Sequence, residues 1–153
     1  MLKEIFEKIA SEIESYLLVK GISTKVKIGM QGEKTGTNDI VFIAMQEYGI
    51  DPILKNHIPV MTDDLSGIPN YSHLISFYIL PVCNKYSRRL QLIETLVELF
   101  ELKPFFNLTL SNGEFELSIS MKSTTTNTYE QFWISRQQRP QPVLFYQARV
   151  SSI

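Results

Sequence analysis

The sequence predicts an α/β (α+β) fold, in which two long helices and one short C-terminal helix pack on a mixed β-sheet of about four to six strands. Two long segments carry apolar residues at helical spacing, and several others are β-branched-rich or alternate between apolar and polar residues. No internal repeat or linker divides the chain. Its 153 residues match the length of one domain, about 100–200 residues, and we expect 1–153 to form one.

The first expected helix covers residues 2–19. Ile5, Ile9 and Ile13 recur at helical spacing, and charged residues fill the opposite side. Gly21 then supplies a C-terminal stop. The apolar stripe of this helix requires a sheet on which to lie.

Three strands are expected next. Residues 26–30 alternate between apolar and polar positions, which is typical of a short half-exposed strand. The apolar runs 40–45 and 74–82 suit central strands that are buried on both faces. Between them, residues 49–70 hold several prolines and glycines and read as a long irregular loop, a kind of segment that is usually functional.

The second long helix is expected at 87–102, with apolar residues around about half of its surface. One sheet face needs a narrower stripe, so the helix needs a second apolar neighbour, either the first helix or another subunit. Arg88 and Arg89 lie near its N-terminal end, where each cation opposes the helix dipole by roughly 0.3–1 kcal/mol. Either solvent screens them or an acidic partner surface compensates them.

The C-terminal third predicts a hairpin, a short helix and a final strand. Asn112-Gly113 is the expected tight turn between 108–110 and 115–121. The hydroxyl-rich residues 123–128 are suited to capping a helix that ends before Pro140. Residues 143–150 form the last strand, which we expect at a sheet edge where another chain can pair with it.

The composition excludes several function classes. Fifteen Lys and Arg balance sixteen Asp and Glu to a formal charge of −1, so no bulk field attracts nucleic acid or anionic membrane. The single cysteine, Cys83, excludes an internal disulfide framework and fits a reducing compartment. The longest apolar run, 74–83, is far shorter than the roughly 20 residues that span a bilayer. Without a secretory signal, we expect a cytoplasmic protein with no nucleic-acid, membrane or small-molecule partner.

No catalytic, cofactor or metal site is expected. The glycines around Lys34-Thr35 do not have P-loop spacing. His57, His73 and Cys83 belong to no metal pattern, and Asp63-Asp64 lies in no calcium loop. The cluster of Tyr129, Phe132 and Trp133 is read as core in preference to a stacking platform. The less favoured enzyme hypothesis is a small hydrolase that uses the 49–70 loop, with His57 and Asp63 or Asp64 as acid–base groups.

The order of elements is informative once catalysis is set aside. The segment Tyr129-Glu130-Gln131-Phe132-Trp133 is followed by Arg139-Pro140 and by a final strand with Tyr146, and the apolar strand 74–80 is followed by the helix 88–102. In these features the chain resembles the tail-terminator, or cap, proteins of contractile injection systems, which are related to phage tail terminators.

The resemblance implies a non-enzymatic structural subunit without cofactors. Such subunits form a sixfold ring, a homohexamer, on the last layer of the inner tube and sheath, end polymerisation and anchor the sheath. Another structural component of the same particle, such as a baseplate or neck adaptor, is the open alternative. Assembly is expected in the cytoplasm, as part of a tail-like particle that is phage, secretion apparatus or extracellular device.

A ring requires a heterologous interface, in which one patch meets a different patch on the next copy. We expect the 87–102 helix and the 49–70 loop to contribute to it, and the last strand or a neighbouring edge to accept a sheath arm by β-augmentation. The expected interface residues are Arg88, Arg89, Leu92, Leu96, Leu99, Phe145, Gln147 and Arg149.

Overall fold

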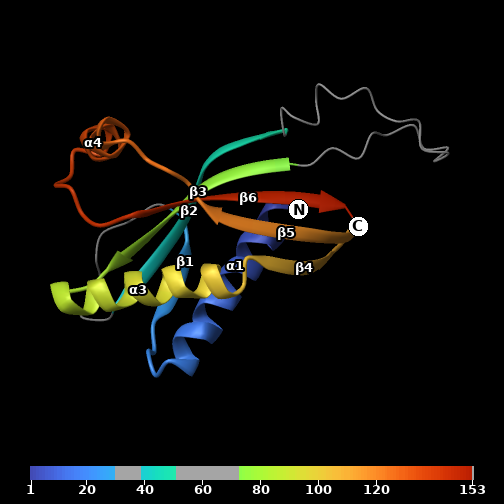
Figure 1. Cartoon of the computed structure of the whole chain (residues 1–153), viewed down its shortest axis with the longest axis horizontal. Helices are drawn as coiled ribbons and strands as arrows, with labels where there is room; N and C mark the ends of the chain where they lie inside the picture. The colour runs from blue at the N-terminus through green and yellow to red at the C-terminus, as the bar shows by residue number, and fades with distance from the viewer. Residues whose placement is uncertain (30–38, 51–72, 153) are drawn as a thin grey trace.

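The computed structural model describes residues 1–29, 39–50 and 73–152. These residues form three helices and six strands, which Figure 1 shows in chain order. The elements are α1 (Leu2–Val19), β1 (Lys25–Ile28), β2 (Ile40–Ile50), β3 (His73–Val82), α3 (Tyr86–Leu102), β4 (Phe105–Leu110), β5 (Gly113–Met121), α4 (Thr126–Ser135) and β6 (Leu144–Ser152). The predicted α/β (α+β) class is confirmed.

All six strands belong to one sheet with the order β1-β2-β3-β6-β5-β4. β1 and β2 are parallel, and every other neighbouring pair is antiparallel, so the sheet is mixed. Because β1 and β4 stand at the ends of this order, they are the edges among the described strands.

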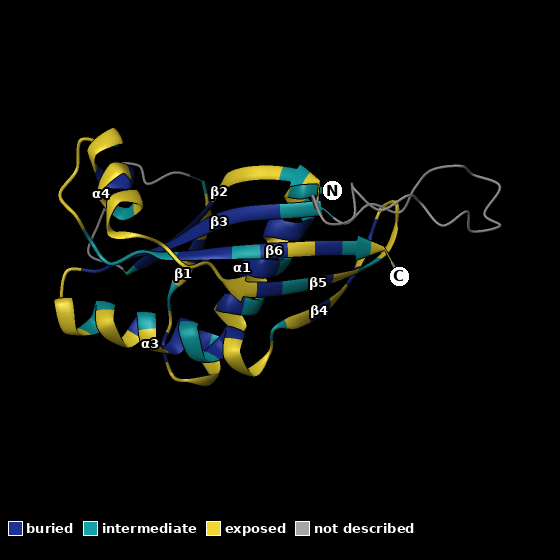
Figure 2. Ribbon diagram, turned by 45° about the horizontal axis from the view of Figure 1, so that its top comes forward, coloured by how far each residue is buried: buried dark blue, intermediate teal, exposed yellow. Residues whose placement is uncertain are grey.

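Helices α1 and α3 cover one face of the sheet. Ile5, Ile9 and Ile13 of α1 are buried as their spacing predicts, and they share a core with Leu92 and Leu96 of α3 (Figure 2). The two helices contact each other, and they are joined at the surface by an ion pair between Lys20 and Glu98 at 3.3 Å. The first helix is therefore an apolar neighbour of α3 within the same chain.

Helix α4 lies on the opposite face, where it covers only one end of the sheet (Figure 1). Phe132 and Trp133 of α4 are 6% and 1% exposed and pack against Phe42, Tyr78 and Phe145 of the sheet. The interpretation as core is confirmed for Phe132 and Trp133, whereas Tyr129 is only partly buried against them. The Thr125 hydroxyl oxygen caps the helix by accepting a hydrogen bond from the Thr128 N–H at 3.2 Å, as the hydroxyl-rich segment predicts.

The two apolar runs are central strands, and β2 is longer than its run predicts. Residues 40–44 and 75–82 are buried, but β2 continues to Ile50. Gly49 and Ile50, which were assigned to the loop 49–70, pair with Leu74 and His73 of β3. Backbone pairing with β3 extends the strand beyond the residues that its apolar pattern marks. The rest of that loop lies outside the described residues.

The hairpin is confirmed, but its turn is displaced by one residue. Leu110 pairs with Gly113, so the two connecting residues are Ser111 and Asn112 rather than Asn112-Gly113. Gly113 has a φ of 138°, which favours glycine, whereas Asn112 has no positive φ. The Glu4 carboxylate of α1 accepts hydrogen bonds from the Ser111 N–H and hydroxyl at 3.3 and 3.4 Å, which ties the turn to the helix.

The prediction that the last strand is a sheet edge is wrong. β6 lies between β3 and β5 and pairs with β3 over residues 144–150 and with β5 over residues 146–152. Tyr146, Ala148 and Val150 are at most 1% exposed because they lie in the core beneath α1 and α3. Strand 143–150 therefore has no free backbone edge with which to bind a partner.

Candidate functional site

The eight side chains expected at an interface are separated by the fold into four places. They are the start of α3, the core beneath α3, a groove beside α4, and the uncovered part of the sheet. Arg88 and Arg89 lie at the start of α3, and Leu92, Leu96 and Leu99 lie in the core beneath it. Phe145 lines the groove, and Gln147 and Arg149 lie on the uncovered part of the sheet.

Leu92, Leu96 and Leu99 form part of the core of this chain. They are 0%, 0% and 2% exposed, so their side chains offer no surface to a second copy. The exposed large apolar side chains of α3 are instead Tyr86, Leu90 and Leu102, at 65%, 46% and 71%. The sequence pattern showed which positions of the helix are apolar but not which of them face outward.

The two arginines lie at the junction of α3 with the ends of β2 and β3. Arg88 donates a hydrogen bond from Nε to Oδ2 of Asp39 at 3.0 Å, and Arg89 donates from Nη2 to the carbonyl oxygen of Cys83 at 3.2 Å. The sequence left two alternatives for these cations, screening by solvent or compensation by an acidic partner surface, but the charge of Arg88 is compensated by an aspartate of the same chain. This pair fixes the start of α3 against the sheet.

Cys83 is buried beside this junction, with 6% of its surface exposed. Burial, followed by the negative charge of Asp39, raises the pKa of its thiol to about 11, although the nearby Arg89 and Arg88 act to lower it. The thiol is therefore neutral near pH 7 and is a structural residue rather than a nucleophile.

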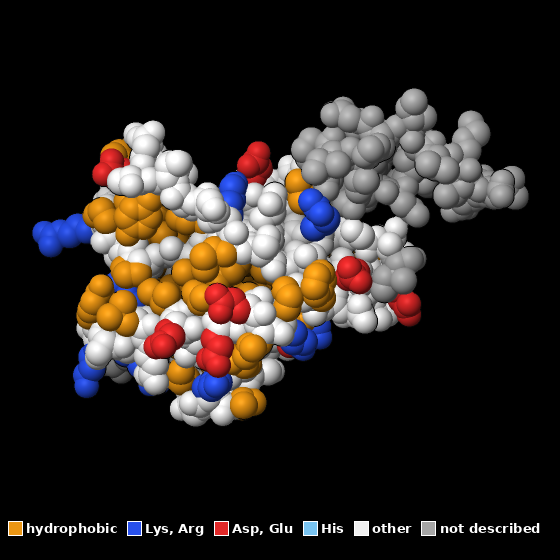
Figure 3. All heavy atoms as spheres, viewed as in Figure 1, with side chains coloured by type: hydrophobic (Ala, Val, Ile, Leu, Met, Phe, Trp, Pro, Cys, Tyr) orange, Lys and Arg blue, Asp and Glu red, His pale blue; other side chains and the backbone are white. Residues whose placement is uncertain are grey.

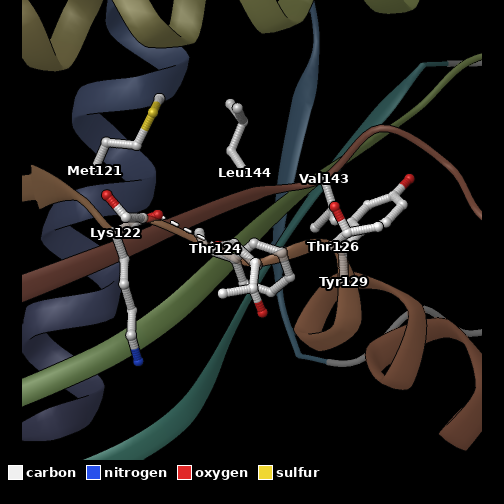
Figure 4. Close-up of a pocket in the computed structure, with 10 residues that line it drawn as sticks. Met121, Lys122, Thr124, Thr126, Tyr129, Val143 and Leu144 are labelled. Carbon is white, nitrogen blue, oxygen red and sulfur yellow. Dashed lines mark hydrogen bonds between the residues drawn. The ribbon is translucent and has the colours of Figure 1, made fainter.

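A groove of about 540 Å³ opens where β5 ends and β6 begins, next to α4 (Figure 4). Met121 and Leu144 line one side of it and Tyr129 and Val143 line the α4 side. Its remaining walls are residues 122–126 and Phe145. Apolar side chains gather on this face of the molecule between α4 and α3 (Figure 3). The groove is suited to an apolar segment or side chain of a partner.

Gln147 and Arg149 lie on the same face of the sheet as α4, in the part that α4 leaves uncovered. They pair with Ser120 and Ser118 of β5, and Ser118 and Arg149 are among the partly or fully exposed residues of this face. This half of the sheet presents polar side chains rather than a second apolar layer.

The described ranges contain no group of three or more His, Cys, Asp or Glu that could hold a metal ion. His73 stacks on Tyr48 and accepts or donates a hydrogen bond through Nδ1 to its hydroxyl at 2.8 Å. The segment around Lys34-Thr35 and the proposed acid–base groups His57, Asp63 and Asp64 lie outside the described residues. Among the helices described, none has the length and apolarity to cross a membrane.

Sequence reasoning missed the sheet edge at β4. Its six residues, Phe105–Leu110, alternate between exposed and buried side chains and contain no charge and no proline. Only residues 108–110 were assigned to a strand, because Pro104 and two adjacent phenylalanines obscure the alternation that begins at Phe105. The absence of charge from a whole strand was the available signal for an edge that can bind.

Two solved structures have a similar fold. The sheath/tube terminator of PVC, an extracellular contractile injection system, in its extended state matches 99% of this chain and 56% of its own chain, with a TM-score of 0.75 and 12% identity. The tube terminating cap of the anti-feeding prophage, AFP, matches 97% of this chain and 54% of its own, with a TM-score of 0.60 and 11% identity. No protein-family model and no curated protein matches the chain.

These likenesses show the fold. The resemblance to tail terminators that the sequence indicated is confirmed by it, because both similar structures are terminators or caps of contractile particles. The chain spans a little more than half the length of each of these two proteins.

Proposed function

We propose that this chain is a structural cap of a contractile injection system or phage-like tail, which ends the growth of the tube and sheath and anchors the sheath. The observation that carries the proposal is the likeness of fold, over 99% of the chain, to a sheath/tube terminator. Such a role is steric and cohesive, so it needs interaction surfaces and no bond-making groups.

The cap acts as a homo-oligomeric ring, a hexamer, built through a heterologous interface. On α3 this interface uses the exposed Tyr86 and Leu90 next to Arg88 and Arg89, in place of the buried leucines. The groove lined by Met121 and Phe145 is the second patch, because apolar side chains line part of it and none of its lining residues belongs to α3. One copy would present its helix and the next its groove.

Tube and sheath subunits are the other partners. Gln147 and Arg149 contact them through side chains, since β6 is paired on both sides and offers no backbone edge. The chain assembles in the cytoplasm and becomes part of the tail-like particle. It acts without a small-molecule substrate or cofactor.

The purified chain tests the ring directly. Negative-stain images of the wild-type protein are expected to show sixfold rings, and mass photometry to show the corresponding oligomer. The double variant Tyr86→Glu with Leu90→Glu places two charges on the proposed helical patch and should yield monomers. Val19→Glu is the matched control, because Val19 is 81% exposed on α1 and lies outside both patches.

Reconstitution with the tube and sheath subunits of the same particle tests the capping. Particles assembled with the chain should have a narrow length distribution and a ring at the end far from the baseplate. Rings bound at the baseplate end would make the chain an adaptor and contradict the proposal. Tails of unchanged, broad length distribution would also contradict it.

A further inference from the structure

We propose that the outer edge of β4 binds an extended segment of another protein, which adds to the sheet as a seventh strand and carries basic side chains at alternate positions. The inference goes beyond the proposed cap and does not depend on it. It rests on the unpaired backbone of β4, on the contrast with the edge at β1, and on two glutamates of β5.

The backbone of β4 presents its free groups through every second residue. The Ile119 N–H donates to the Pro104 carbonyl oxygen at 2.8 Å. In the register of β4 and β5, these two residues are the pair that comes directly before the pair of Phe105 and Ser118. Because hydrogen-bonded pairs alternate in an antiparallel ladder, Phe106, Leu108 and Leu110 bond to β5. The N–H and carbonyl groups of Phe105, Asn107 and Thr109 therefore point outward, where no described strand pairs with them.

The two edges of the sheet differ in how they are protected. On β1, Lys25 and Lys27 are exposed, and the Val26 N–H already donates to the Glu14 carboxylate at 2.9 Å. Edge lysines and a side chain bonded to the backbone both oppose strand addition. β4 has no charge, no proline and no register shift along its length. An unprotected edge of this length is an aggregation hazard unless a partner covers it.

Strand β4 is held in place at both ends by α1. At its start, Lys103 Nζ lies 3.1 Å from Glu12 Oε2, and at its end Ser111 bonds to Glu4. The inward side chains Phe106, Leu108 and Leu110 are at most 7% exposed. Because the strand is already ordered, β4 itself loses little conformational entropy when a partner binds, so the total cost of binding is lower than at a mobile edge.

Charge on the neighbouring strand specifies the partner. Glu114 and Glu116 stand opposite Thr109 and Asn107, so both carboxylates lie on the face of β4 that α1 does not cover. An added strand would run two strand spacings, about 10 Å, from β5, within reach of a long basic side chain. Phe105, 60% exposed on the same face, would meet a basic side chain through its ring. Lysine or arginine at every second position of the partner satisfies these contacts.

Two peptides of nine residues test the proposal with the full chain. One alternates valine and lysine, and the other alternates valine and glutamate. Isothermal titration calorimetry should detect the lysine peptide and find the glutamate peptide at least about tenfold weaker. Amide hydrogen exchange should show new protection at Phe105, Asn107 and Thr109, with Phe106 and Leu108 unchanged.

Three variants locate the site. Glu114→Lys with Glu116→Lys should reverse the preference between the peptides. Asn107→Pro removes an outward N–H and should abolish binding. Ser120→Lys is the matched control, because it adds charge to the same face of β5 beyond the end of β4 and should leave the preference as it is. Circular dichroism melting checks that each variant is folded. If Asn107→Pro is unfolded, the double variant Glu114→Lys with Glu116→Lys still tests the proposal.

Several results would overturn the inference. One is equal affinity for both peptides, and another is protection at β1 instead of β4. A third is sedimentation evidence that Asn107→Pro dissociates a self-associated form, since β4 would then pair with a second copy. If the wild-type chain forms no rings but still binds the lysine peptide, the proposed cap is contradicted and the binding edge of β4 is not. The failure of one proposal can therefore be distinguished from the failure of the other.

Discussion

Arg88 Nε and Asp39 Oδ2 are 3.0 Å apart, which joins the first turn of α3 to the residue that precedes β2. Each side chain is partly exposed, with 34% and 21% of its surface accessible, so solvent weakens the pair. The aspartate nevertheless offsets a cation at the unfavourable end of a helix dipole. The contact connects segments that are 49 residues apart in the sequence.

Asp39→Asn should lower the free energy of unfolding by about 1 kcal/mol, because it leaves Arg88 without its counter-charge near the helix N-terminus. Urea denaturation measures the change. The double variant Asp39→Asn with Arg88→Gln should recover part of the loss, since the uncompensated cation is gone. Equal stability of the wild type and Asp39→Asn would show that solvent alone screens Arg88.

Leu96→Ala should destabilise the chain by about 2–5 kcal/mol, because the side chain is fully buried and its loss leaves a cavity. Leu102→Ala, on the same helix but 71% exposed, should change the free energy of unfolding by less than about 0.5 kcal/mol. Urea denaturation of both variants compares them. If Leu96→Ala changed only the oligomeric state, the placement of Leu96 in the core would be wrong.

Thr125→Ala should cost about 1 kcal/mol of stability, because the Thr128 N–H at the start of α4 loses its acceptor. Thr125→Ser keeps a hydroxyl acceptor and should retain wild-type stability. Thermal melting followed by tryptophan fluorescence reports on this region, since Trp133 lies in α4. A serine variant as unstable as the alanine variant would exclude capping as the cause.

Glu12 predicts a loss of stability in acid. Burial raises its pKa, but hydrogen bonds from Lys8 and Lys103 outweigh this and leave the pKa below its ordinary value of 4.5. Because the folded pKa is lower than the unfolded one, the contribution is complete above about pH 4.5 and is lost as pH falls through the folded pKa. Glu12→Gln should therefore flatten the dependence of the unfolding free energy on pH below about pH 4.5, which urea denaturation at a series of pH values measures.

Cys83 should resist alkylation while the chain is folded. Its thiol is 6% exposed and its pKa is raised to about 11, so little thiolate is present or accessible at pH 8. Iodoacetamide followed by intact-mass spectrometry should show modification only after urea is added. Rapid labelling of the native protein would contradict the burial of this residue.

The sequence identified elements whose signals are local. Helix α1 has the expected bounds because apolar residues recur at helical spacing along the segment, and they are buried from Ile5 to Leu17. The hairpin 105–121 was found from Gly113 and the alternation after it, although its turn begins one residue earlier than expected. Helix α4 begins at Thr126, within the hydroxyl-rich segment that was expected to cap it.

The order of strands could not be derived in this way. Leu144, Tyr146 and Ala148 alternate in a manner that fits an edge or a central strand equally well, so the position of β6 between β3 and β5 depends on contacts with residues that are distant in the sequence. Contacts with distant residues also explain why Leu92 and Leu96 lie in the core of the chain and not at the expected interface. Periodicity marks the apolar side of a helix, but the three-dimensional packing decides whether the apolar neighbour belongs to the same chain.

The central position of β6 has a consequence for biosynthesis. As the chain emerges from the ribosome, β1-β2-β3 and the β4-β5 hairpin can each form, but they cannot join until residues 144–152 have been translated. Until then β3 and β5 both lack the neighbour that separates them in the finished sheet. The nascent chain thus passes through a stage with two unsatisfied half-sheets, which is when it most needs protection from aggregation.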